Sequence, residues 1–550
     1  MSDLSRRDFL SAATLAGAGA VIGPKVGDHR TPTPSVHPSI RPSAHPLAFE
    51  LDESTIADLQ AGMKSGKYTA RRLTELYFGR IGEMDRQGPT LRAMLDHDPD
   101  ALAIADALDL ERTAGKLRGP LHGIPVVIKD NIATGDRMTT TAGSLALEGC
   151  IARRDSGVAA RLRAAGAVIL GKTNLSEWAN YRSTRATSGW SSRGGQCRNP
   201  YVLDRNPCGS SSGTGSGVSA NFAAVGVGTE TDGSIVCPSA TNGLVGIKPT
   251  VGLVSRAGII PISHSQDTAG PMARTVTDAA LLLGALAGPD PRDPATAGAA
   301  GHAAADYSVF LRADGLKGAR IGVLRGSFVG YHPEVDKLYQ DALDVMTRAG
   351  AQLIDPVALP HSGEYDAAEG VVLSYEFKSD LNAYLADLGA AAPRKTLAEI
   401  IRFNEEHKDR VMPWFGQEEF LKAEARGPIT EKAYRSARGK CVELSRKAGI
   451  DAVMAAHRLD ALVAPTGNPA WPTDLVNGDH FTGGSSTPAA VAGYPSITVP
   501  MGSVTGLPVG LSFIGGAWSE GTMIRVGFAF EQATQARRAP EFLPTLPDTP

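Results

Sequence analysis

Residues 123–131 read GIPVVIKDN, a β-branched apolar run with a glycine before it and polar residues after it. Such a run predicts a buried strand that ends at a polar tip, which places Lys129 at the tip. Farther along, residues 158–165 have the pattern of a helix, and residues 167–170, AVIL, have that of a second buried strand. Strands that alternate with helices indicate an α/β fold.

The rest of the pattern places these strands in one mixed α/β domain without internal repeats. Residues 51–110 carry apolar side chains at helical spacing among many charged ones, which predicts amphipathic helices. Residues 215–227 are small and apolar enough for a tightly packed helix, and strands are predicted again at 496–500 and 510–514. We interpret residues 300–440, which are more charged, as a divergent helical insertion or cap.

Residues 1–28 resemble a twin-arginine export signal. SRRDFL at residues 5–10 is followed by small and apolar residues without charge up to Gly23. That run is shorter than the ~20 apolar residues of a membrane-spanning helix, so no stable membrane insertion is expected. Residues 29–48 are rich in Pro, Ser, His and Thr and predict a linker. We therefore expect a periplasmic or secreted protein whose folded domain covers residues 49–540, with an ordinary N-terminal helix as the alternative.

The composition excludes several classes of partner. A formal net charge of -3 argues against the broad basic surface that holds nucleic acid, so we expect a small, roughly neutral substrate. The five cysteines are widely spaced and form no CxxC pair, so the sequence predicts no metal site and mostly free thiols. A bridge between Cys197 and Cys208 is left open. No cofactor is expected.

Two familiar motifs occur in contexts that do not suit them. Residues 166–173 match the phosphate-loop pattern GxxxxGK[ST], but the residues inside it are a strand core rather than a loop. Residues 209–213 match the GxSxG nucleophile elbow, although no apolar strand precedes them. A Ser-His-Asp triad remains an alternative there. The nearest downstream histidines are His264, His302, His332 and His361.

Three segments carry the strongest functional signal: GIPVVIKDN at 123–131, CGSSSG at 208–213 and GTETDGSI at 228–235. Together they resemble the amidase signature family, whose pattern has a lysine at a strand end, a Gly/Ser-rich segment and a nucleophilic serine in an oxyanion loop. The resemblance covers most of residues 51–534. It implies a single large domain built on a mixed, mostly parallel twisted sheet with helices on both faces.

The resemblance and the chemistry of amides together assign the catalytic roles. Amide hydrolysis needs an activated nucleophile, a stabilised oxyanion and a proton for the leaving amine. Ser234 is the predicted nucleophile, and Lys129, kept neutral by burial, is the predicted base. Ser210 lies 24 residues before Ser234, as the family pattern leads us to expect. Its hydroxyl can pass the proton between the other two.

Backbone groups complete the predicted site. The N–H groups of Thr231, Asp232, Gly233 and Ser234 are predicted to form the oxyanion hole. Gly209 and Ser211 are predicted to support the triad. The resemblance also implies that the Gly209–Ser210 peptide bond is cis.

Departures from the family pattern narrow the substrate. Asp232 stands where the family commonly has glycine, and Val236 stands where it commonly has arginine. The GTETDGS version, with NPYVLD at 199–204 before it, resembles the branch that includes peptide amidases, which remove ammonia from C-terminal peptide amides. Asp232 takes part in substrate selection on this interpretation, or it only holds the loop in shape by accepting hydrogen bonds.

We therefore predict a hydrolase that cleaves carboxamide C–N bonds through an acyl-enzyme. Amidases of other small aliphatic, aryl or fatty amides are the alternatives within this chemistry. The glutaminase subunit of a tRNA-dependent amidotransferase is a further alternative, against which the export signal argues. A non-catalytic binding protein on the same scaffold is disfavoured because Lys129, Ser210 and Ser234 are all present.

Overall fold

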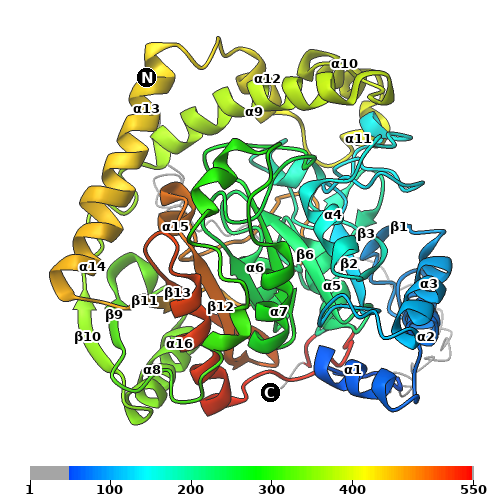
Figure 1. Cartoon of the computed structure of the whole chain (residues 1–550). Coiled ribbons are helices and arrows are strands. Elements are labelled where there is room, and N and C mark those ends of the chain that lie inside the picture. Colours follow the sequence, from blue (N-terminus) through cyan, green and yellow to red (C-terminus); the bar gives the residue numbers. More distant parts are fainter. Residues whose placement is uncertain (1–48, 548–550) are drawn as a thin grey trace, which may run out of the picture. The chain divides into compact units, whose positions relative to one another are not determined.

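The two predicted strands at 124–128 and 167–170 lie side by side in an 11-stranded sheet (Figure 1). The computed structural model describes residues 49–547. The predicted export signal over 1–28 and linker over 29–48 lie outside the described residues.

The strands and their order are as follows. Along the chain they are β1 (Met94–His97), β2 (Pro125–Lys129), β3 (Val168–Thr173), β4 (Trp190–Ser191), β5 (Gly195–Gln196), β6 (Val225–Glu230), β7 (Val245–Lys248), β8 (Thr268–Ala273), β9 (Arg320–Leu324), β10 (Gln352–Val357), β11 (Ala461–Pro465), β12 (Ser496–Val504) and β13 (Leu507–Ile514). The large sheet has the order β1-β3-β2-β6-β8-β7-β12-β13-β11-β9-β10, and β4 pairs with β5 separately.

The helices alternate with these strands over much of the chain. They are α1 (Ile56–Lys64), α2 (Ala70–Met84), α3 (Ala101–Thr113), α4 (Gly157–Ala164), α5 (Ser212–Ser219), α6 (Val236–Thr241), α7 (Val276–Leu286), α8 (Pro333–Arg348), α9 (Asp366–Leu388), α10 (Leu397–Glu406), α11 (Lys408–Val411), α12 (Glu418–Glu424), α13 (Lys432–Val442), α14 (Asp451–His457), α15 (Thr487–Ala492) and α16 (Glu520–Thr534). Residues 215–227, predicted as one helix, are divided between the end of α5 and the start of β6.

The α/β class and the single large domain are confirmed, but most strand pairs are not parallel. In the part of the chain that the structure describes, four pairs of the large sheet are parallel (β2–β3, β2–β6, β9–β10 and β9–β11) and six are antiparallel. One cause is local, because β12 and β13 form a hairpin in which Gly506, at φ +84°, occupies the tight turn.

Helices cover both faces of the sheet, as the resemblance implies. In β12, Ile497 and Val499 point toward Gly527 of α16. The residue between them, Thr498, points to the opposite face, where Ala240 of α6 lies close to the same strand pair. Successive residues of a strand face opposite sides, so α6 and α16 cover different faces. The largest core cluster fills the space between the sheet and its helices.

The segment over residues 300–440 is not helical throughout. Its first half contributes β9, α8 and β10, and the two strands extend the large sheet at one end. Its second half forms α9 to α13, the yellow-green helices along the upper border of Figure 1. Among residues 49–547, no helix is long and apolar enough to cross a membrane.

Candidate active site

Lys129 is the last residue of β2 and is buried. Its Nζ lies 2.8 Å from Ser210 Oγ, 2.9 Å from Thr229 Oγ1 and 3.2 Å from the Thr229 carbonyl oxygen. Burial lowers the pKa of Lys129 to about 7, although Asp267 and Glu230 act in the opposite direction. A neutral amine can donate its two hydrogens to Thr229, which leaves its lone pair for the Ser210 hydroxyl.

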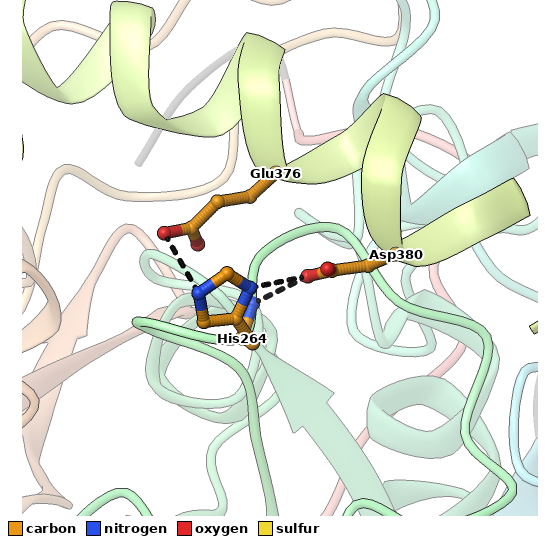
Figure 2. A group of neighbouring side chains, drawn as sticks. All are labelled: His264, Glu376 and Asp380. Carbon is orange, nitrogen blue, oxygen red and sulfur yellow. Dashed lines mark hydrogen bonds and ion pairs between the residues drawn. The ribbon is translucent and has the colours of Figure 1, made fainter. Parts of the chain in front are cut away.

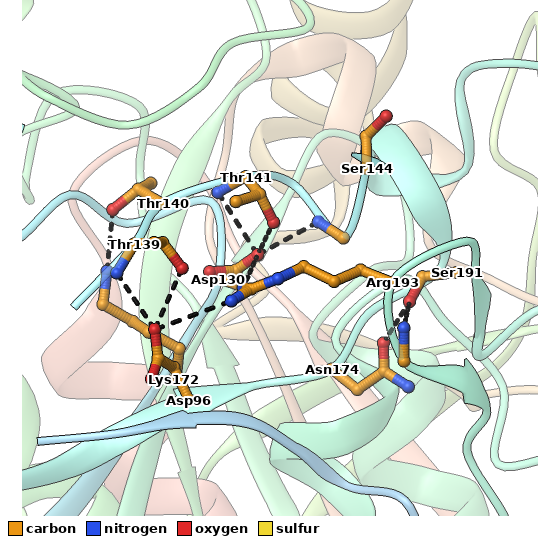
Figure 3. Close-up of polar contacts among 12 residues, drawn as sticks. Asp96, Asp130, Thr139, Thr140, Thr141, Ser144, Lys172, Asn174, Ser191 and Arg193 are labelled. Atoms are coloured by element: carbon orange, nitrogen blue, oxygen red, sulfur yellow. Dashed lines mark hydrogen bonds and ion pairs between the residues drawn. The ribbon is translucent and has the colours of Figure 1, made fainter. Parts of the chain in front are cut away.

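The strand end that carries Lys129 is fixed by a buried polar network (Figure 3). The Asp130 carboxylate accepts hydrogen bonds from the Thr141 hydroxyl and from the Gly143 N–H. Lys172 Nζ donates to the Ile132 carbonyl at 2.7 Å and to Thr140 Oγ1 at 2.8 Å. Lys172 belongs to the buried strand β3, so the phosphate-loop match at 166–173 is a strand, as predicted.

Ser210 follows a cis peptide bond after Gly209, as the resemblance implies. Gly209 is required by space, because a Cβ at this position would collide with Ser176 Oγ. The next residue, Ser211, accepts from the Thr229 N–H and donates to the Thr229 carbonyl, so the Gly/Ser segment is held against the end of β6. Gly209 and Ser211 therefore occupy the supporting positions that were predicted for them.

Ser234 lies in the turn between β6 and α6, and 8% of its surface is exposed. Gly233, at φ +80°, permits this turn. The buried Glu230 carboxylate accepts from the N–H groups of Ile235 (2.7 Å) and Val236 (3.0 Å) and so fixes the residues after the nucleophile. The Ser211 N–H donates to the Ser234 carbonyl at 3.2 Å and joins the two serine segments.

The predicted oxyanion loop has donors to offer. Within residues 49–547, the N–H groups of Thr231, Asp232, Gly233 and Ser234 have no protein acceptor. Adjacent unpaired N–H groups of this kind can bind an oxyanion.

The side chains of this loop hold it in place. The Asp232 carboxylate accepts from the hydroxyls of Ser486 and Thr487 at the start of α15. Thr231 Oγ1 donates to Asp267 at 2.6 Å. Asp232 therefore acts as a buried hydrogen-bond acceptor that anchors the loop, which is the second of the two roles considered for it.

One cysteine pairing differs from the expectation. Cys208 forms a disulfide with Cys237, with 6.0 Å between their Cα atoms, and not with Cys197. Cys197 is free and buried, as are Cys150 and Cys441. The pairing depends on the proximity of α6 to the Gly/Ser segment, which sequence spacing does not reveal.

A cavity of about 420 Å³ lies beside the catalytic strands. Thr229 and Thr231 line it on the side of β6, Ile260 lines another wall, and His264 and Asp380 also border it. The α9 helix of the 300–440 segment thus contributes to a cavity next to the triad.

His264 connects this cavity to α9 (Figure 2). Its Nδ1 lies 2.8 Å from Asp380 Oδ2, and its Nε2 lies 3.3 Å from Glu376 Oε1. These three side chains have ligand atoms within 4.8 Å of one another and could hold a metal ion. Glu376, however, already accepts hydrogen bonds from Ser265 and Tyr434, and each ring nitrogen faces a different carboxylate. The arrangement is that of an imidazolium between two carboxylates, and the Asp380 contact raises the pKa of His264.

The alternative Ser-His-Asp triad is not assembled. The hydroxyls of Ser211 and Ser212 donate to the carbonyls of Thr229 and Cys208. His264 contacts the α9 carboxylates. His302 stacks on Trp518, and His361 lies 3.1 Å from Glu364. The GxSxG match at 209–213 has no preceding strand after β5, so it is not a nucleophile elbow.

Thr229 is a positioning residue that the motif contains but that sequence reasoning did not single out. Replacing it with valine keeps the shape and removes the oxygen that accepts from Lys129 and from Asn131 Nδ2 (3.0 Å). We expect kcat to fall about 10-fold, which corresponds to ~1.4 kcal/mol, with little change in KM.

The pH profile distinguishes positioning from a general loss of structure. An acceptor favours the ammonium form, so its loss in Thr229→Val lowers the pKa of Lys129 and moves the rising part of the kcat/KM profile to lower pH. Thr229→Ser retains the hydroxyl and serves as the matched control. Equal kinetics for wild type and Thr229→Val would contradict this role.

Comparison with known proteins agrees with this geometry. The sequence profile of the family described as Amidase matches residues 72–524. A crystal structure of native peptide amidase from Stenotrophomonas maltophilia is 52% identical, with a TM-score of 0.87, and the match covers 90% of this chain and 100% of that chain. A probable amidase of Arabidopsis thaliana is 43% identical, with 90% of this chain and 93% of the relative covered. One of the subunits of glutamyl-tRNA(Gln) amidotransferase from a Roseiflexus species is 35% identical, with 88% and 97% covered.

Proposed function

The chain belongs to the amidase signature family and is an amide-hydrolysing enzyme, and from this premise we propose that it deamidates C-terminal peptide amides to the peptide acid and ammonia. We further propose that Ser234, Ser210 and Lys129 form its catalytic triad. The observation that carries the mechanism is the 2.8 Å contact between Lys129 Nζ and Ser210 Oγ, which lies beside four N–H groups without a protein acceptor in the described chain.

In the proposed acylation step, Ser234 Oγ attacks the amide carbonyl carbon. Its proton moves to Ser210 Oγ while the Ser210 proton moves to the neutral Lys129 amine. The N–H groups of residues 231–234 stabilise the oxyanion that forms. Collapse of the tetrahedral intermediate breaks the C–N bond, and the proton returns from Lys129 through Ser210 to the leaving nitrogen, which departs as ammonia.

Deacylation repeats the same proton path with water. Water gives a proton toward Ser210 and Lys129 as it attacks the ester carbonyl, and the acid product leaves when that proton returns to Ser234 Oγ. The only charge that must be stored between the two steps is the proton on Lys129. A lysine with a pKa of about 7 can hold and release this proton at neutral pH.

The peptide-amide substrate is supported by two observations. The chain is 52% identical to a peptide amidase over 90% of its length, against 35% for the Roseiflexus amidotransferase protein. It also carries the GTETDGS version of the oxyanion loop. We retain the amidases of other small amides as the alternative.

We also propose that the protein is exported by the twin-arginine pathway. The sequence SRRDFL at residues 5–10 motivates this proposal. The Cys208–Cys237 disulfide supports it, since disulfides persist in oxidising compartments.

A substrate panel tests the proposed function. Ammonia release is measured with a C-terminally amidated dipeptide, free glutamine, a fatty primary amide and an aryl primary amide. We expect the peptide amide to give the highest kcat/KM, by at least about 100-fold, because hydrogen-bonding subsites discriminate by about that much or more. Preference for another amide would discard the peptide-amide assignment, and preference for glutamine would favour an amidotransferase-type function.

A further inference from the structure

The Cys208–Cys237 disulfide joins the two segments that carry the catalytic serines. Cys208 is two residues before Ser210, and Cys237 is three residues after Ser234. The bridge therefore spans the gap across which the proton must pass between the two serine hydroxyls.

Noncovalent contacts fix other parts of these segments. At the far end of α6, Thr241 Oγ1 (2.8 Å) and Asn242 Nδ2 (2.9 Å) both donate to the Pro207 carbonyl. Near the serines, the hydrogen bond from the Ser211 N–H to the Ser234 carbonyl joins the segments directly. The disulfide is the covalent connection between these two attachments.

We propose that the Cys208–Cys237 disulfide is a positioning element that sets the separation of Ser210 and Ser234, so that the enzyme reaches its full rate only when the bridge is formed. This inference rests on the proposed function, because it assumes that these two serines exchange a proton. A small displacement of catalytic groups is enough to slow catalysis strongly.

The other three cysteines leave the bridge as the only site that a reductant changes. Cys150, Cys197 and Cys441 are free and buried. Burial raises the pKa of Cys197 to about 12 and the pKa values of Cys150 and Cys441 to about 11, so these thiols react slowly at neutral pH. All five cysteines of the sequence lie in the described part of the chain.

Reduction of the bridge can be written explicitly. A dithiol reductant gives two electrons and two protons to the Cys208–Cys237 sulfurs. The S–S bond breaks, two thiols form, and the dithiol becomes a cyclic disulfide. The reaction reverses when the reductant is removed in the presence of oxidised dithiol.

The test compares the full protein with the bridge formed and with the bridge absent. Variants are Cys208→Ser with Cys237→Ser in one chain, and Cys197→Ser as the matched control on a free buried cysteine. The substrate is a small p-nitrophenyl ester, whose hydrolysis needs the same nucleophile but not a peptide amide. Failure of the peptide-amide assignment therefore leaves this measurement intact.

We expect kcat to fall at least 10-fold in the double variant, with KM changed less than twofold. The kcat/KM profile should keep its rising limb near pH 7, because Lys129 is not altered. Circular dichroism and the melting temperature show whether the variant is folded at the assay temperature. A folded double variant with kcat within twofold of wild type would overturn the proposal.

A second measurement does not depend on the variant folding. Folded wild type is treated with a dithiol, and alkylation followed by mass spectrometry counts the opened bridges. Loss of kcat in proportion to opened bridges, with recovery on reoxidation, supports the positioning role. Full bridge opening without loss of kcat overturns it.

Discussion

Replacing Ser234 with alanine is expected to lower kcat for the hydrolysed amide by about 10⁶-fold, which is the scale of nucleophile loss in serine hydrolases. Ser234 is the serine of the oxyanion turn after β6, and its loss removes the atom that forms the acyl-enzyme. The oxyanion N–H groups remain, so KM should change little.

The matched control for this variant lies on the next helix. Ser239 is buried on α6, and its Oγ has no hydrogen-bond partner in the described structure, so Ser239→Ala should leave both kcat and stability nearly unchanged. Mass spectrometry of wild type mixed rapidly with an ester substrate should show an acyl adduct on the peptide that contains Ser234. Near-wild-type ammonia release by Ser234→Ala, or an adduct on Ser211, would place the nucleophile elsewhere.

The three triad residues could be predicted from the sequence because each lies in a short, distinctive segment at a fixed point of a strand or turn. Lys129 ends β2, and Ser234 follows β6. These strands are adjacent and parallel, with Val127 opposite Gly226, so their carboxyl ends meet at the same edge of the sheet. Local pattern therefore determined which residues converge.

The features that the sequence did not reveal depend on contacts between distant segments. Whether β7 and β8 run parallel or antiparallel to their neighbours is decided by long connections and not by the apolar run itself. The Cys208–Cys237 pairing spans 29 residues and requires α6 to lie beside the Gly/Ser segment.

The contact between the cap and the catalytic loop is of the same kind. Glu369, Glu376 and Asp380 of α9 accept from Gln266, Ser265 and His264, which are consecutive residues of one loop. The spacing of these acids places them on one face of a helix. Nothing in the sequence of the cap indicates which loop that face meets.

Lys129→Met is expected to lower kcat/KM by about 10³-fold to 10⁴-fold at pH 8, because general-base catalysis contributes about this much. The sign of the accompanying pH effect follows from burial. The pKa of Lys129 is lowered to about 7, so below pH 7 the ammonium cannot take a proton from Ser210, and above pH 7 the neutral amine can. In wild type, kcat/KM should therefore rise with pH through about 7.

The variants separate Lys129 from other groups that titrate nearby. The pKa of Asp267 is raised by burial to about 6, so a rising limb alone does not identify the base. Lys129→Met should lose the limb near pH 7, and Lys129→Arg should be equally slow because a guanidinium stays protonated. Lys172→Met is the matched control, since it removes another buried lysine and should reduce stability by ~3–5 kcal/mol while keeping the limb. Persistence of that limb in Lys129→Met would assign the base to a different group, whereas its loss, together with the inactivity of Lys129→Arg, identifies a neutral lysine as the proton acceptor.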